Sequence, residues 1–153
     1  ALEHDVGSNI RARYWRIAFT DPINPAGFVE LARLWMGPLW SPQRNLSYGA
    51  GLTWEARSVS EYSLGGVLFT EPRPPARVLR LTLNALNDAE AYGTLLDAQR
   101  RVGTDGELWV IPNWDDAARR FKRDFLARFR RFDPIAQIHN RLHETSFELE
   151  ERL

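Results

Sequence analysis

Few residues in the sequence have a type and spacing that could support catalysis or hold a metal ion. His139 and His143 stand four positions apart, a spacing that on a helix would point both imidazoles toward one metal. The surrounding residues instead indicate a loop running into a strand, where that spacing separates the two side chains by about 13 Å. We therefore expect two ordinary packed or surface histidines rather than a metal site.

Two pairs of adjacent carboxylates are the next candidates, for general acid–base chemistry. They are Asp115-Asp116 and Glu150-Glu151. Neighbouring residues on a strand point to opposite faces, and acidic residues also favour the start of a helix, so a structural role is the stronger interpretation for both pairs. The chain has no cysteine, no Gly-rich phosphate loop and no G-x-S-x-G motif. We predict no catalytic, metal-binding or cofactor-binding residue, no cofactor, and a protein that is not an enzyme.

The six tryptophans are the most informative side chains. Trp15, Trp35 and Trp109 fall in expected strands and are predicted to lie in the core. The others fall in or beside loops, where a large aromatic ring either anchors the loop or forms a binding surface, and the sequence leaves both readings open. The candidate interaction surface comprises Trp40, Tyr48, Trp54 and Trp114, together with Thr82 on an expected strand edge.

Length, composition and charge exclude several classes of protein. The 153 residues, 44% of them hydrophobic, suit one globular domain or two small ones. The 20 basic and 20 acidic residues give zero net charge, which argues against a nucleic-acid partner. No apolar run approaches the roughly 20 residues of a membrane-spanning helix, so we expect no membrane span. The chain starts without Met and without a signal-peptide pattern, which indicates either processing or a missing upstream part.

The first half of the chain is predicted to be a small, all-β unit. Alternating apolar residues predict strands over residues 13–19 and 28–36, separated by a Pro- and Gly-rich turn at 21–27. Weaker strand patterns cover 52–57 and 67–70, with a tight turn or bulge at Gly65-Gly66 between them. Three prolines within residues 71–75 interrupt any element. We therefore predict a domain of residues 1–71 followed by a second domain of residues 76–153.

The second half is predicted to mix strands with one helix. Residues 77–85 alternate as a strand, and Asn87 with Glu90 forms the capping-box pattern of a helix that ends before Gly103. A short strand at 107–111, a helical turn at 115–121, and strands at 125–132 and 143–150 follow. The fold class is thus α+β, mainly β: a small β-sandwich-like unit, then a strand-helix-strands unit.

Several segments of the chain form a pattern found in a known family. They are Arg13-Tyr14-Trp15-Arg16-Ile17, Asp21 with Asn24-Pro25, Gly27-Phe28-Val29-Glu30-Leu31, Leu34-Trp35-Met36-Gly37, and the closing Phe147-Glu148-Leu149-Glu150-Glu151. With these segments the first half looks like the later strands of a discoidin or galactose-binding-like β-sandwich, and the second half is similar to the belt domain of distal tail proteins. The chain thus resembles structural proteins from the tail tip of long, non-contractile-tailed phages.

This resemblance implies a virion protein, made in the bacterial host cytoplasm, that joins the tail tube to the host-recognition apparatus. Such proteins form rings, commonly hexameric, and contact other phage tail proteins. A ring needs a heterologous interface, which we expect at the edge of the 77–85 strand, the helix and the C-terminal strand. Proline at Thr82 should then block assembly more than folding. The alternative is a carbohydrate-binding β-sandwich module, with Trp40, Tyr48 and Trp54 stacking on a surface glycan.

Overall fold

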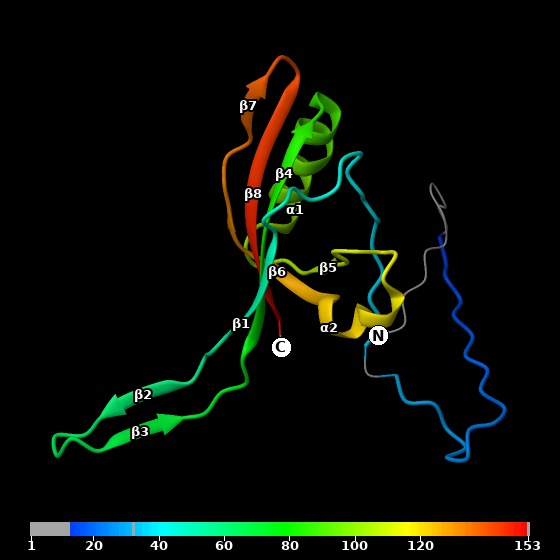
Figure 1. Cartoon of the computed structure of the whole chain (residues 1–153). Helices are drawn as coiled ribbons and strands as arrows, with labels where there is room; N and C mark the ends of the chain where they lie inside the picture. The colour runs from blue at the N-terminus through cyan, green and yellow to red at the C-terminus, as the bar shows by residue number, and fades with distance from the viewer. Residues whose placement is uncertain (1–12, 32, 153) are drawn as a thin grey trace. The chain divides into compact units, whose positions relative to one another are not determined.

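The chain divides into two units. The computed structural model describes residues 13–31 and 33–152, and the division falls between Ala1–Trp40 and Ser41–Leu153 (Figure 1). The sequence placed the boundary at residues 71–76 instead. The structure differs because the strand Gly51–Glu55 and the strand Ala76–Leu86 are neighbours in one sheet, with Trp54 opposite Arg77 and Glu55 opposite Ala76.

The described part of the first unit is extended chain with a turn. The turn is where the sequence predicts it: Asn24 Nδ2 donates to the Phe28 carbonyl at 2.8 Å, Asn24 Oδ1 accepts from the Ala26 N–H at 2.9 Å, and Gly27 has a φ of +69°. The strands predicted over 13–19 and 28–36 are wrong for the described residues. A strand requires a hydrogen-bonded neighbour, and the described part of this unit pairs with none.

The second unit is built on an antiparallel sheet with the strand order β1-β4-β8-β6-β5. A sixth strand, β7, pairs with one end of β8. The prediction of a mainly β chain of the α+β class is confirmed. The strands are β1 (Gly51–Glu55), β4 (Ala76–Leu86), β5 (Leu108–Val110), β6 (Phe125–Phe132), β7 (Ala136–His139) and β8 (Leu142–Glu151).

Alternation along the two long central strands divides the sheet into a buried face and a charged face. On β4 and β8, Leu81 lies opposite Phe147 and both are buried, whereas their neighbours Arg80 and Glu148 lie opposite each other on the other side. Side chains of one strand thus alternate between core and surface. The strands predicted over 77–85, 107–111, 125–132 and 143–150 are confirmed to within two residues.

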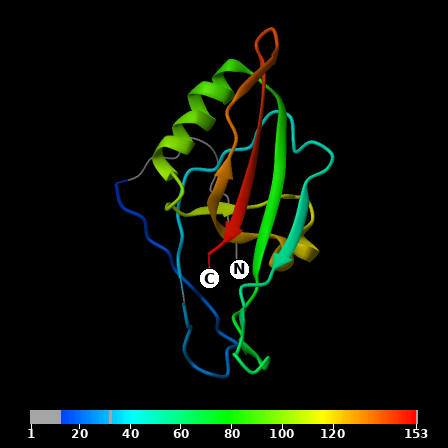
Figure 2. The same cartoon turned by 90° about the vertical axis from the view of Figure 1, so that its left-hand side faces the viewer.

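A helical segment follows β4 and packs against the buried face of the sheet (Figure 2). It starts with a π-helical stretch, η1 (Ala89–Leu95), and continues as α1 (Leu96–Val102). The predicted capping box is confirmed, since Asn87 Oδ1 accepts from the Glu90 N–H at 2.9 Å and Glu90 Oε2 accepts from the Asn87 N–H at 3.1 Å. The segment ends at Gly103, whose φ of +57° suits glycine. The π-helical form of its first turns was not predicted.

Two further short elements precede β6. The 3-10 turn η2 (Ala117–Arg119) and the helix α2 (Arg120–Arg123) match the helical turn predicted just before that strand. Asp124 then has an extended backbone and leads into β6.

A two-stranded hairpin projects from the sheet between β1 and β4 (Figure 1). It consists of β2 (Val59–Tyr62) and β3 (Leu68–Glu71), and we call residues 59–71 the arm. The Ser63 N–H donates to the Val67 carbonyl at 2.8 Å across its turn, and Gly66 has a φ of +78°. Pro72, Pro74 and Pro75 lie between the arm and β4 and lack the N–H that would continue the ladder. The arm therefore forms its own two-stranded sheet.

Candidate interaction surface

Arginine and glutamate side chains form an ion-pair network across four strands on the charged face of the sheet. Glu150 is only 9% exposed and lies between Arg57 and Arg128, which approaches its Oε2 to 2.9 Å. Arg57 lies in the loop after β1, Glu150 in β8 and Arg128 in β6. The ion pairs therefore connect different strands of the sheet. The network comprises Glu55, Arg57, Arg80, Arg128, Arg130, Glu148 and Glu150.

The two adjacent carboxylates at the end of β8 are held in their charged form. Burial alone would raise the pKa of Glu150, but hydrogen bonds from Arg57 and Arg128 outweigh it and lower that pKa. Burial would also raise the pKa of Glu151, but hydrogen bonds from Arg77 outweigh the effect of burial. The pKa of Glu151 is therefore lowered as well. The two side chains bind different arginines, as expected for strand neighbours on opposite faces. A carboxylate locked in this way is a structural group rather than a proton carrier.

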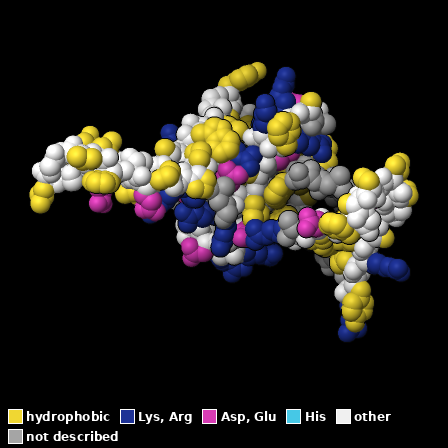
Figure 3. All heavy atoms as spheres, turned by 90° about the horizontal axis from the view of Figure 1, so that it is seen from below, with side chains coloured by type: hydrophobic (Ala, Val, Ile, Leu, Met, Phe, Trp, Pro, Cys, Tyr) yellow, Lys and Arg dark blue, Asp and Glu magenta, His cyan; other side chains and the backbone are white. Residues whose placement is uncertain are grey.

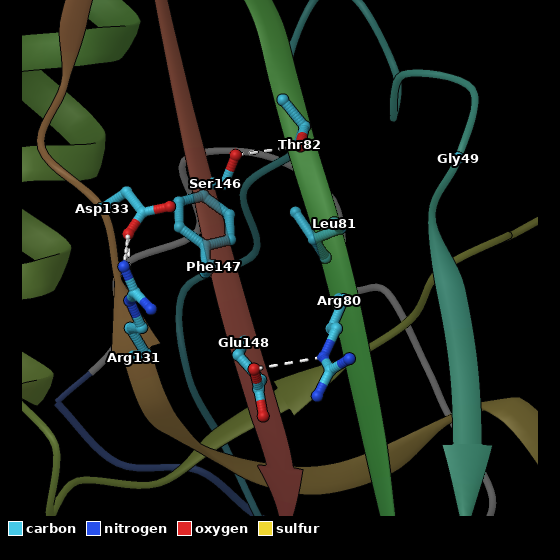
Figure 4. A pocket seen from close by; sticks show the side chains of 9 residues that line it. All are labelled: Gly49, Arg80, Leu81, Thr82, Arg131, Asp133, Ser146, Phe147 and Glu148. Atoms are coloured by element: carbon cyan, nitrogen blue, oxygen red, sulfur yellow. Dashed lines mark hydrogen bonds and ion pairs between the residues drawn. The ribbon is translucent and has the colours of Figure 1, made fainter.

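A hollow of about 230 Å³ lies on the same face (Figure 4). Its charged side chains are already paired: Arg80 donates to Glu148 at 3.2 Å, and Arg131 donates to Asp133 at 3.1 Å. The charged lining of the hollow therefore consists of two ion pairs. It is lined by Gly49, Arg80, Leu81, Thr82, Arg131, Asp133, Ser146, Phe147 and Glu148.

The arm carries a concentration of exposed apolar side chains. Every residue of β2 and β3 is exposed, and Tyr62, Leu64 and Phe69 have relative exposures of 75%, 111% and 65%. Figure 3 shows apolar side chains along the length of the arm and acidic ones on one side of it. An isolated two-stranded hairpin is only marginally stable in water, and an apolar surface of this kind typically marks a contact with another protein.

A second exposed aromatic group lies around α2. Phe121 is 68% exposed, and the Lys122 ammonium lies 5.6 Å from the centre of its ring. Trp114 is stacked by the Arg120 guanidinium at 4.5 Å. Trp54 borders the group through Arg77, which lies 5.7 Å from the Trp54 ring and donates to the Lys122 carbonyl at 3.1 Å. We call Trp54, Trp114, Phe121 and Lys122 the α2 patch.

The predicted surface residues are only partly brought together. Trp54 and Trp114 both contribute to the α2 patch, as their contacts with Arg77 and Arg120 show. Tyr48 is fully exposed in the segment before β1, at 109%, and Trp40 is the last residue of the first unit. The sequence did not identify Phe121 or Lys122 as surface residues. For the arm it predicted a strand over 67–70, which matches β3, and the turn at Gly65-Gly66, but it did not predict β2.

Thr82 does not lie on an open strand edge, contrary to the prediction. β4 pairs with β1 on one side and with β8 on the other. Beyond the end of β1, the Ser47 N–H donates to the Thr82 carbonyl at 3.0 Å, and the Thr82 hydroxyl bonds the Ser146 hydroxyl at 2.9 Å. The edges of the five-strand path are β1 and β5.

The tryptophans that were predicted to lie in the core are more exposed than expected. Trp15 and Trp35 are 47% and 38% exposed, which corrects their assignment to a core. Trp109 lies in β5 as predicted and is half-buried.

The histidines do not share a ligand. His143 is buried on β8, where its Nε2 lies 2.7 Å from Asp88 Oδ1 and its ring meets Tyr92 edge-on at 4.9 Å. The His139 Nδ1 accepts from the Asn140 N–H instead, at 2.6 Å. Among residues 13–31 and 33–152, no three His, Asp or Glu side chains gather in a group that could hold a metal ion.

Comparison with known proteins adds no relative. No protein-family model matches the sequence, and no curated protein matches it significantly. Within the described part of the chain, none of the helices is long and apolar enough to cross a membrane.

Proposed function

We propose that this protein is a structural subunit of a phage tail tip, which assembles into a ring or adaptor between the tail tube and the host-recognition apparatus. The observation that carries the proposal is the arm: a hairpin that is exposed along both strands and projects apolar side chains such as Tyr62, Leu64 and Phe69. Ordering such a hairpin is favourable when it docks onto another molecule. The sequence resemblance to tail-tip proteins supports the same role.

The first unit supplies a second support. Its alternating apolar side chains are exposed, among them Ile17, Phe19 and Phe28. Residues 13–36 have the pattern of strands without a hydrogen-bonded partner strand among the described residues. Part of the proposal is that these segments complete a galactose-binding-like β-sandwich, and that the sheet of the second unit is a belt-like domain.

The surroundings of Trp54 and Trp114 favour assembly of copies over the carbohydrate-binding alternative. A sugar platform uses the open faces of aromatic side chains. The guanidinium groups of Arg77 and Arg120 already lie over the rings of Trp54 and Trp114. The arm, by contrast, offers aliphatic and aromatic side chains of the kind that proteins bury against one another.

Electron microscopy of the purified protein tests this function. At high protein concentration we expect closed rings of uniform diameter, and we expect single particles when residues 59–71 are replaced by a short Gly-Ser turn. The Gly-Ser variant should keep the circular dichroism of the folded sheet, because every residue of β2 and β3 is exposed. Rings formed equally well without the arm would contradict the role assigned to it.

A further inference from the structure

The two faces of the arm differ in chemistry. Its register places Val59 opposite Glu71 and Glu61 opposite Phe69, so these four side chains share one face. The other face carries Ser60 opposite Thr70 and Tyr62 opposite Leu68. Glu61 has no ion-pair partner among the described residues, whereas Glu71 pairs with Arg73. One face of the arm is therefore both apolar and acidic, with a free carboxylate at its centre.

The α2 patch has the complementary character. It combines exposed aromatic rings with a cation, since Lys122 makes no ion pair within the described chain and extends over the ring of Phe121. The Arg77 guanidinium lies over the Trp54 ring but is paired with Glu151, so the positive charge of the patch comes from Lys122. An acidic, apolar surface and a basic, aromatic surface attract each other and exclude water when they meet.

We propose that the acidic face of the arm docks onto the α2 patch of a second copy of this chain, with Glu61 and Glu71 facing Lys122. This contact rests on the proposed assembly function and names its interface. Within one chain the arm projects away from the sheet, on a different side from α2 (Figures 1 and 2). The two surfaces are different, so each copy still offers one of each after pairing. Such a head-to-tail contact continues from copy to copy until a ring closes.

Zero-length cross-linking tests the contact directly in the wild-type chain. Lys122 is the only lysine, so a carbodiimide can join its amine only to a carboxylate that lies against it. A mixture of isotopically labelled and unlabelled protein should yield mixed-label peptides joining Lys122 to Glu61 or Glu71. Lys122→Arg is the matched control: it keeps the positive charge and the oligomer but loses these cross-linked peptides.

A charge exchange provides the second measurement. Glu61→Lys and Lys122→Glu should each weaken association about five- to tenfold, and the double variant should restore it, because the pair is re-formed with reversed charges. Both side chains are exposed, so the variants should fold like the wild type.

The two proposals fail in different ways. Oligomers that form without mixed-label peptides from Lys122 to the arm, and that are insensitive to both charge reversals, would overturn this interface while leaving the assembly function standing. A chain that stays monomeric at every concentration, with no such peptides, would overturn both.

Discussion

At the scale of single residues, neighbouring carboxylates in this chain act as structural anchors. Glu151 accepts from the Arg77 N–H at 3.0 Å and also pairs with the Arg77 guanidinium, which in turn donates to carbonyls at the end of α2. One acidic side chain thus fixes the arginine that joins β4, β8 and α2.

Because of this ion pair, the free energy of unfolding is expected to depend on pH. The pKa of Glu151 is lowered in the folded chain, below its ordinary value of 4.5. A carboxyl of this kind stabilises the fold above its unfolded pKa, and the contribution is lost as the pH falls through the lower, folded pKa. We expect the free energy of unfolding to decrease below about pH 4.5. Glu151→Gln should lower it by about 1–3 kcal/mol at pH 7 and flatten the pH dependence.

Urea denaturation between pH 7 and pH 3 measures this effect. Glu144→Gln is the matched control, because Glu144 lies on the same strand without an ion pair among the described residues. A pH dependence that is unchanged in Glu151→Gln would contradict the assigned role of that carboxylate.

The capping box gives a second prediction at this scale. Asn87→Ala removes the acceptor for the Glu90 N–H and should destabilise the protein by about 1 kcal/mol. Asn140→Ala, in the exposed turn between β7 and β8, should have no comparable effect. Equal unfolding midpoints for the two variants in urea would contradict the cap.

At the scale of elements, the position of β4 inside the sheet reverses an expectation drawn from sequence. Thr82→Pro should prevent folding rather than assembly, because proline removes an N–H from a strand that is paired on both sides. We expect a loss of several kcal/mol, which is comparable to the whole stability of an ordinary domain.

Thr70→Pro is the matched control for that variant, since Thr70 lies in the exposed arm. It should leave the melting temperature of the sheet nearly unchanged while impairing association. Circular dichroism during heating distinguishes the two, and a folded Thr82→Pro protein would contradict the strand order.

The elements that sequence could predict are those whose local pattern is sufficient. Alternation located β4, β6 and β8, and the Asn87–Glu90 pair located the start of the helix. Alternation over residues 13–36 predicted strands wrongly, because alternation along one segment cannot show whether a partner strand exists. β2 was missed because Val59–Tyr62 holds only two apolar residues, and the α2 patch was missed because it depends on contacts between β1, β4 and α2.

At the scale of the whole molecule, the account depends on contacts that a single copy leaves unmade. The sheet stabilises itself through ion pairs across its strands, whereas the arm and the α2 patch keep apolar side chains exposed. Under the proposed assembly, other copies of the chain cover these exposed apolar side chains.

The measurement that tests this most directly is the mass of the purified protein by light scattering after size exclusion, over a range of concentrations. The account predicts a discrete multiple of 17.7 kDa that is lost in Glu61→Lys and regained in the Glu61→Lys, Lys122→Glu double variant. A mass of one chain at every concentration, for the wild type and the variants alike, would contradict it.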